Sequence, residues 1–92
     1  MTANMGTVAS GDYATSFGYY TTAAGNSSFV IGKYNIIDTD NTYAFIVGNG
    51  TNVATANKSN AFTVDWDGNA FVKAKLFATN IDITESLTAN DI

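Results

Sequence analysis

The chain has 92 residues with no histidine, cysteine or arginine, and its four lysines face eight acidic residues, for a net charge of −4. Without histidine or cysteine, disulfides and the usual zinc, haem and iron–sulfur ligand sets are excluded, so we expect no cofactor and no metal site. The negative charge argues against nucleic acid as a partner, and no apolar run approaches the ~20 residues of a membrane span, so we expect no membrane insertion.

Small size limits how much of its own core the chain can bury. A domain of this length buries only ~60–65% of the surface that its unfolded chain exposes. Because disulfides and metals are excluded, a subunit interface is the remaining source of stability. Only 13% of the residues are charged, against ~25% in ordinary soluble domains. This composition is typical of a stacked β-solenoid, and we expect the chain to be a piece of a longer one.

Glycines mark a regular repeat in the first half of the chain. The residue before each glycine alternates between small and large, so the true period is fourteen residues, with two glycine corners in each coil. Glycine at a corner supplies backbone angles that other residues avoid, or lets neighbouring coils approach closely. A helix is disfavoured, since each interior glycine costs ~1 kcal/mol relative to alanine. The repeated pairs are Ser10-Gly11, Phe17-Gly18, Ala24-Gly25 and Ile31-Gly32.

The spacing slips once after Gly32. The next glycine that follows a large residue is Gly48, sixteen residues later, in a sequence that matches the one around Gly32. The extra residues fall within 36–42, and the Asp-Thr-Asp-Asn run there is typical of turns. We therefore predict an exposed loop at residues 36–42.

Residues 59–72, SNAFTVDWDGNAFV, predict a β-hairpin. A two-residue turn at Asp67-Gly68 suits the right-handed twist of paired strands. Such a turn pairs Val64 with Phe71, and Thr63 with Val72, so both faces of the hairpin carry apolar groups. Two apolar faces imply covering neighbours on both sides.

The remaining residues alternate between apolar and polar side chains. Lys73 and Lys75 alternate with alanine and leucine, and residues 81–84 alternate again. This pattern predicts short strands joined by polar turns at residues 79–80 and 88–91, with one helical turn at residues 84–87 as the alternative.

Two resemblances follow from these segments. Residues 14–35 and 44–50 resemble the fourteen-residue head repeat of trimeric autotransporter (YadA-like) adhesins, although aromatic residues are commoner here. That resemblance implies a left-handed parallel β-roll in which three chains associate around one axis. Residues 59–69 resemble a segment of phage and prophage tail-fibre structural proteins, where it follows adhesin-like heads and leads into a shaft.

We therefore predict an all-β fold: a trimeric left-handed parallel β-roll (solenoid) head at residues 1–56, a β-hairpin transition at 57–76 and the start of an intertwined β shaft at 77–92. The predicted function is that of a structural, non-enzymatic segment of a phage tail fibre or receptor-binding adhesin, located in the virion tail fibre or on the bacterial cell surface. A homotrimer is the expected assembly, with a host cell-surface glycan or protein as a further partner. The alternatives are a monomeric carbohydrate-binding or ice-binding solenoid, and a fibre segment beside a glycan-degrading domain.

Candidate functional residues fall into two groups. Exposed aromatic side chains stack on sugars or proteins, or pack between subunits; the candidates are Tyr13, Tyr19, Tyr20, Tyr34 and Trp66. Apolar residues of the repeat and hairpin form the predicted trimer core; they are Ala9, Phe17, Ala23, Val30, Ile31, Ile46, Val47, Phe62, Val64 and Val72.

Catalytic and calcium-binding patterns are incomplete. Asp65 and Asp67 are the only closely spaced carboxylates in an expected ordered element, and their place at a turn favours capping over acid–base chemistry. Residues 38–41 and 65–69 begin like cation loops but lack the glycine and the acid that would complete them. We predict no catalytic residues.

Overall fold

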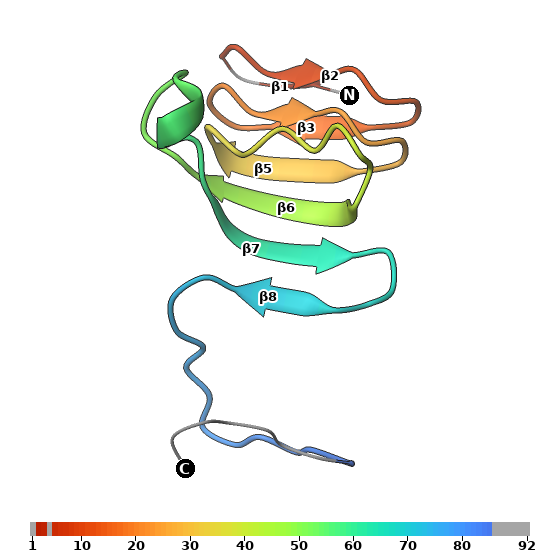
Figure 1. The fold of residues 1–92 in the computed structure, drawn as a ribbon, viewed down its shortest axis with the longest axis vertical. Coiled ribbons are helices and arrows are strands. Elements are labelled where there is room, and N and C mark those ends of the chain that lie inside the picture. The colour runs from red at the N-terminus through yellow and green to blue at the C-terminus, as the bar shows by residue number, and fades with distance from the viewer. Residues whose placement is uncertain (1, 4, 86–92) are drawn as a thin grey trace.

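A computed structural model describes residues 2–3 and 5–85 and shows an all-β chain wound into stacked coils (Figure 1). Six strands form one sheet in the order β1-β3-β5-β6-β7-β8, and β2 pairs with β4 in a second, two-stranded sheet. The elements are β1 Thr2–Ala3, β2 Val8–Ala9, β3 Thr15–Phe17, β4 Thr22–Ala23, β5 Phe29–Lys33, β6 Tyr43–Asn49, the 3-10 turn η1 Thr55–Asn57, β7 Asn60–Asp65 and β8 Ala70–Val72.

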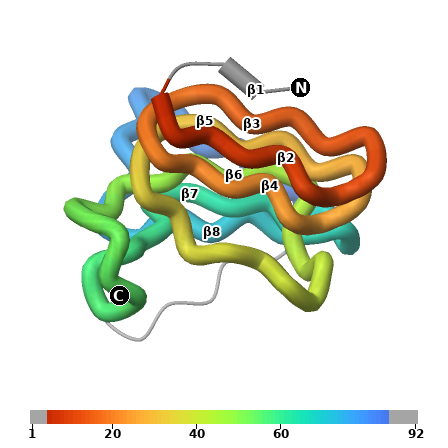
Figure 2. Tube along the Cα trace, turned by 90° about the horizontal axis from the view of Figure 1, so that it is seen from above, coloured from red at the N-terminus to blue at the C-terminus, as the bar shows by residue number. Residues whose placement is uncertain are grey.

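Strand pairing confirms the predicted period and its slip. Residues fourteen apart pair in parallel, as Thr15 with Phe29 in β3–β5 and Val8 with Thr22 in β2–β4. Between β5 and β6 the step is sixteen, since Phe29 pairs with Phe45. Seen from above, successive coils lie over one another, with β2 and β4 across the coil from β3 and β5 (Figure 2). No helix of the described residues is long and apolar enough to cross a membrane.

The predicted loop at residues 36–42 is exposed apart from Asp38, which is 9% exposed. Its carboxylate accepts hydrogen bonds from the backbone N–H groups of Thr42, at 3.0 Å, and Tyr43, at 2.7 Å. These bonds hold the loop where it enters β6, so Asp38 has a structural role in the turn.

Small side chains fill the inside of each coil. Ala23 and Val30 are 0% exposed and Ile46 is 1% exposed, and Ala9 packs against the same cluster. The assignment of Ala23, Val30 and Ile46 to a core shared between copies is therefore wrong, because a single chain already removes them from solvent. They stabilise the coil itself, together with Ala14.

The Asn35 side chain bonds to the backbone of β4 at the place where, because of the slip in the repeat, no further strand pairs with it. Its side chain is 1% exposed, and its amide oxygen accepts a hydrogen bond from the Thr22 N–H at 2.8 Å. Its Nδ2 donates to the Thr22 carbonyl at 3.0 Å and to the Ile36 carbonyl at 2.9 Å. A side-chain amide carries the same donor and acceptor as a peptide group. It satisfies the backbone groups of β4 that a further strand would otherwise bond.

Left-handed residues mark both corners of every coil. Tyr13, Ser27 and Asn41 have φ values of 59°, 62° and 52°, and lie fourteen residues apart at one corner. At the other corner Gly6, Tyr20 and Tyr34 have φ values of 66°, 52° and 43°, and they too lie fourteen residues apart. For residues other than glycine and asparagine this conformation costs ~1–2 kcal/mol. The repeat therefore includes a strained position that glycine spacing alone does not reveal.

Tyr13→Asn is expected to stabilise the folded chain by about 0.5–1 kcal/mol, because asparagine tolerates the left-handed conformation better than tyrosine. Tyr13 is 93% exposed, so little packing is lost with the ring. Urea unfolding followed by circular dichroism measures the change. Tyr13→Phe keeps the strained backbone and serves as control, and equal stability of the two variants would contradict the expectation.

The hairpin forms, but its turn has three residues and its predicted register is wrong. The Asp65 N–H donates to the Asn69 carbonyl at 3.0 Å, and the Gly68 N–H donates to the Asp65 carbonyl at 3.1 Å. Gly68 has a φ of +89°, the left-handed residue of a bulged three-residue loop. The extra loop residue shifts the pairing by one, so Thr63 lies opposite Phe71 rather than Val72.

Beyond β8 the chain leaves the sheet as an extended segment (Figure 1). Residues 73–85 contain no strand, so the strand predicted at 81–84 is absent from the single chain. A strand needs a partner that bonds its backbone, and β8 is the last strand of the sheet. The turn predicted at residues 88–91 lies outside the described residues.

Candidate interaction surfaces

The outward face of the six-stranded sheet is apolar. Side chains alternate along a strand, so the neighbours of the buried Ser16, Val30 and Ile46 point away from the coil. The register aligns these outward residues across the sheet, and β7 and β8 extend the same face. This surface, called the outer face below, consists of Phe17, Phe29, Ile31, Phe45, Val47, Phe62, Val64 and Val72.

Four phenylalanine rings form a continuous ladder on the outer face. The ring centroids lie 6.1 Å apart from Phe17 to Phe29, 5.6 Å from Phe29 to Phe45, and 6.0 Å from Phe45 to Phe62. Phe29 remains 40% exposed although its strand lies inside the sheet. Parallel sheets are normally covered on both faces, so this face lacks its second layer.

The outer face contains six of the ten residues assigned to the trimer core, and it adds two that were missed. Phe29 and Phe45 occupy one column of the sheet, where the preceding coil has Thr15. Aligning the coils with the sixteen-residue step would have placed both in that column. The alignment on glycines did not reveal this column, because its first member is Thr15 and only the next two coils have phenylalanine at that position.

Three of the five predicted binding aromatics form one cluster. The rings of Tyr20 and Tyr34 stack with centroids 5.4 Å apart and planes 2° apart, while Tyr19 meets Tyr20 edge-on at 4.8 Å. Desolvation raises the pKa of Tyr34, and so does its hydrogen bond with the Tyr19 side chain. Tyr19 is 45% exposed and Tyr20 is 37% exposed, so the cluster presents ring surface to solvent.

Tyr13 and Trp66 do not join that cluster. Tyr13 belongs to the opposite corner of the coil, in the column that ends at Asn41. The Trp66 Nε1 donates a hydrogen bond to the Asn41 side-chain oxygen at 3.1 Å and its ring is 50% exposed. The five aromatics therefore divide between the two ends of the strands.

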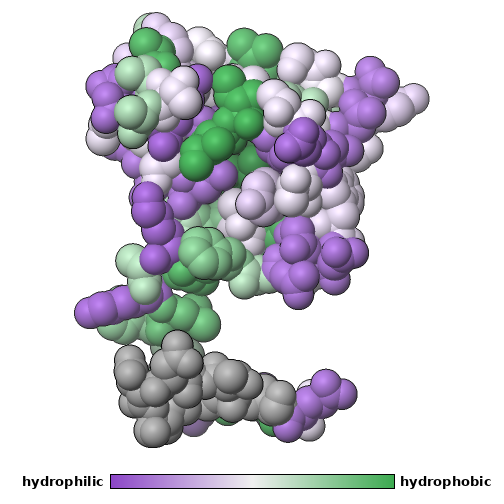
Figure 3. All heavy atoms as spheres, viewed as in Figure 1, coloured by the Kyte–Doolittle hydropathy of each residue, from purple (hydrophilic) through white to green (hydrophobic). Residues whose placement is uncertain are grey.

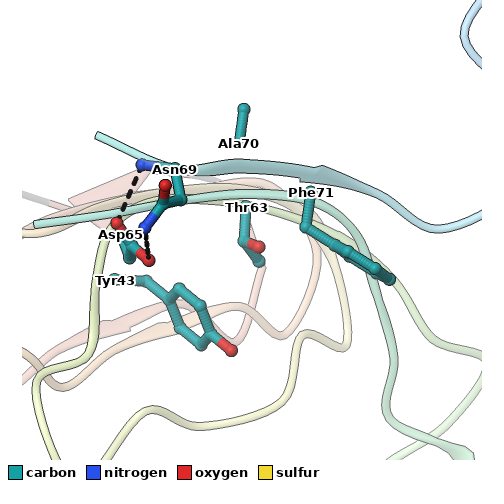
Figure 4. Close-up of a pocket in the computed structure, with 6 residues that line it drawn as sticks. All are labelled: Tyr43, Thr63, Asp65, Asn69, Ala70 and Phe71. Atoms are coloured by element: carbon teal, nitrogen blue, oxygen red, sulfur yellow. Dashed lines mark hydrogen bonds between the residues drawn. The ribbon is translucent and has the colours of Figure 1, made fainter. Parts of the chain in front are cut away.

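A shallow cavity of about 400 Å³ lies on the inner side of the hairpin (Figure 4). Tyr43, Thr63, Asp65 and Phe71 line it, because the hairpin continues the sheet past the last closed coil. Tyr43 points inward since the pairing between β6 and β7 shifts by one residue after it. Phe71 is 62% exposed, so this inner side is only partly covered.

The carboxylate in this cavity is engaged in the turn. Asp65 accepts hydrogen bonds from the Asn69 N–H at 2.9 Å, from the Asn69 Nδ2 at 3.1 Å and from the Asp67 N–H at 3.0 Å. The bonds from Asn69, and then those from the backbone of Asp67, lower the pKa of Asp65 below its usual range. A carboxylate held ionised by turn donors is a cap and a poor proton donor.

Within residues 2–3 and 5–85, no three acidic side chains gather into a group that could hold a metal ion. The principal surfaces are thus the outer face, the tyrosine cluster and the inner side of the hairpin. No family model, curated protein or solved structure matches the chain.

Proposed function

We propose that the chain is a structural, non-catalytic segment of a surface fibre and that three copies associate through their outer faces. The observation that carries this proposal is the uncovered apolar sheet face with its phenylalanine ladder. Monomeric proteins rarely leave a contiguous apolar patch of this kind in water. Phe29 is 40% exposed and the other seven residues of the outer face are half-buried. Covering the face removes their remaining apolar surface from water, at ~25 cal/mol per Å², and therefore favours association.

Three copies account for the features that one chain leaves incomplete. Parallel coils need a second layer on the outer face, and an identical outer face supplies one of matching length. The extended residues 73–85 expose Leu76, Phe77 and Ile81, at 72%, 87% and 66%. In a trimer these segments run side by side and supply one another's missing strand partners, which is the start of an intertwined shaft.

Attachment to a host surface is the proposed role of the assembled fibre, in a phage virion or, alternatively, on a bacterial cell. The resemblance of residues 14–35 to adhesin heads and of residues 59–69 to tail-fibre segments supports this role. The assembled fibre presents three copies of each exposed loop, so a weak contact of each with a glycan or protein becomes a strong one.

An ice-binding solenoid has less support. Ice binding needs a flat, solvent-facing row of threonines, whereas the column that contains Thr21 and Asn35 is buried at 0% and 1% exposure. A monomeric carbohydrate-binding module differs from the fibre segment in mass. Native mass spectrometry of the 92-residue chain near 10 μM is expected to give three times 9.7 kDa. A stable, folded single copy at that concentration would overturn the proposal.

A further inference from the structure

Carboxylates gather at one end of the roll, where the strands of the main sheet begin. Asp12 lies in the loop before β3, Asp38 and Asp40 lie in the loop before β6, and Asp65 and Asp67 lie at the turn that ends β7. Because β7 runs antiparallel to β6, its end lies beside the start of β6. In Figure 3 hydrophilic residues lie at this right-hand end, over the loop after β2 and over the β7–β8 turn, and others lie at the left-hand end. These five residues define the acidic end.

Lysines occupy the opposite end of the same sheet. Lys33 is the last residue of β5, Lys58 precedes β7 and Lys73 follows β8, where its N–H bonds to the Ala61 carbonyl. These three residues define the lysine end. A seven-residue strand such as β6 extends over ~20 Å, so the two ends cannot neutralise each other within one chain.

We propose that the acidic end of each copy packs beside the lysine end of the next copy around the trimer axis. This inference depends on the proposed trimer. Rotation about an axis parallel to the coil stack brings the start of one sheet next to the finish of its neighbour's, a head-to-tail contact that closes into a ring. Opposite charges then meet at all three contacts.

The same charges disfavour wrong assemblies. A copy turned upside down in the ring would place its acidic end against the neighbour's acidic end, and like charges at an interface cost affinity. Apolar contacts between outer faces do not distinguish a parallel copy from an inverted one. The charged ends therefore set the parallel orientation that a fibre needs, so that all three chains enter the shaft together.

Exposed ion pairs are individually weak, typically ~0.2–1 kcal/mol, but here several repeat at three contacts. They are screened by salt, with a Debye length of about 10 Å at 0.1 M. Trimer affinity is therefore expected to fall as sodium chloride rises from 50 to 500 mM.

Three variants test the pairing. The first carries Asp12→Lys, Asp40→Lys and Asp67→Lys, the second carries Lys33→Glu, Lys58→Glu and Lys73→Glu, and the third carries all six substitutions. Each of the first two makes both ends alike in sign, because the first changes the acidic end from −5 to +1 and the second changes the lysine end from +3 to −3. Each is expected to weaken the trimer at least tenfold at low salt. The third exchanges the signs and is expected to restore its own trimer.

Mixing separates charge pairing from general effects. The six-substitution chain, made with a heavy isotope, is expected to form almost no mixed trimers with the unchanged chain in native mass spectrometry, because every mixed contact sets like charges together. Statistical mixing, or trimers indifferent to salt and to both three-residue variants, would overturn the inference and leave the proposed trimer standing. A monomeric unchanged chain would instead overturn the proposed function.

A control that adds positive charge away from both ends carries Val8→Lys in β2 and Ile37→Lys in the loop after Asn35, both at exposed positions. It is expected to leave trimer affinity within about twofold. Equal weakening by this control and by the Asp12→Lys, Asp40→Lys, Asp67→Lys variant would mean that added positive charge weakens the trimer wherever it lies, and would overturn the inference. Circular dichroism confirms that each variant keeps its strand signal.

Discussion

Gly32→Ala is expected to prevent the roll from folding. Gly32 has a φ of +99°, and a Cβ added there would overlap the carbonyl oxygen of Gly48 in the next coil and lie 2.9 Å from its nitrogen. Both atoms belong to backbone that β5–β6 pairing holds in place, so no side-chain rotation relieves the overlap. The expected loss in the free energy of unfolding exceeds the ~1–2 kcal/mol cost of an alanine in the left-handed conformation. It is large compared with the ~5–15 kcal/mol stability of a small domain.

Gly68→Ala is the matched control. Gly68 has a φ of +89°, so it pays the same conformational cost, but nothing lies within 4 Å of an added Cβ. Its loss of stability is expected to be about 1 kcal/mol. Circular dichroism and urea unfolding of both variants measure the difference. Equal losses would show that backbone conformation alone, without close contact between coils, sets the requirement for glycine at Gly32.

The coil period was predictable from sequence because the restriction on glycine is local and recurs. Gly11, Gly18 and Gly32 approach the backbone of the next coil, where only glycine fits, and Gly25 approaches the Asn41 side chain. The seven-residue spacing of these glycines therefore reports half a coil. The sixteen-residue step to Gly48 was visible for the same reason.

Features that depend on partners in space were not predictable. The turn at Gly68 admits a two-residue or a three-residue loop, and only the pairing of Asp65 with Asn69 distinguishes them. The role of Asn35 depends on where the slip removes a strand from beside Thr22. Left-handed corners at Tyr20 and Tyr34 went unnoticed because tyrosine carries no local preference for that conformation.

The candidate surfaces were predictable in kind and only partly in detail. Alternation shows that Val30 and Ile31 face opposite ways, but it does not say which of them the coil encloses. The structure places Val30 inside and Ile31 on the outer face. Deciding this from sequence would require the direction in which the chain curls, which small residues such as Ala23 indicate only weakly.

Phe29→Asp is expected to abolish the trimer. Phe29 is the most exposed ring of the ladder and contacts both Phe17 and Phe45, so a carboxylate there would be buried without a partner when outer faces meet. Leaving an unpaired charge in an interface costs several kcal/mol, which corresponds to an affinity loss of at least a hundredfold. Sedimentation velocity near 10 μM is expected to show the single-chain mass of 9.7 kDa.

Val8→Asp tests whether the outer face is specifically responsible. Val8 is 48% exposed and lies in β2 of the two-stranded sheet, on the opposite side of the coil (Figure 2). A carboxylate there remains in water in the proposed trimer, so the trimer mass is expected to persist. Phe29→Leu keeps an apolar side chain and is also expected to remain trimeric. If Val8→Asp dissociated the assembly while Phe29→Asp did not, the copies would meet through the two-stranded sheet, because an introduced carboxylate is tolerated only where no partner covers it.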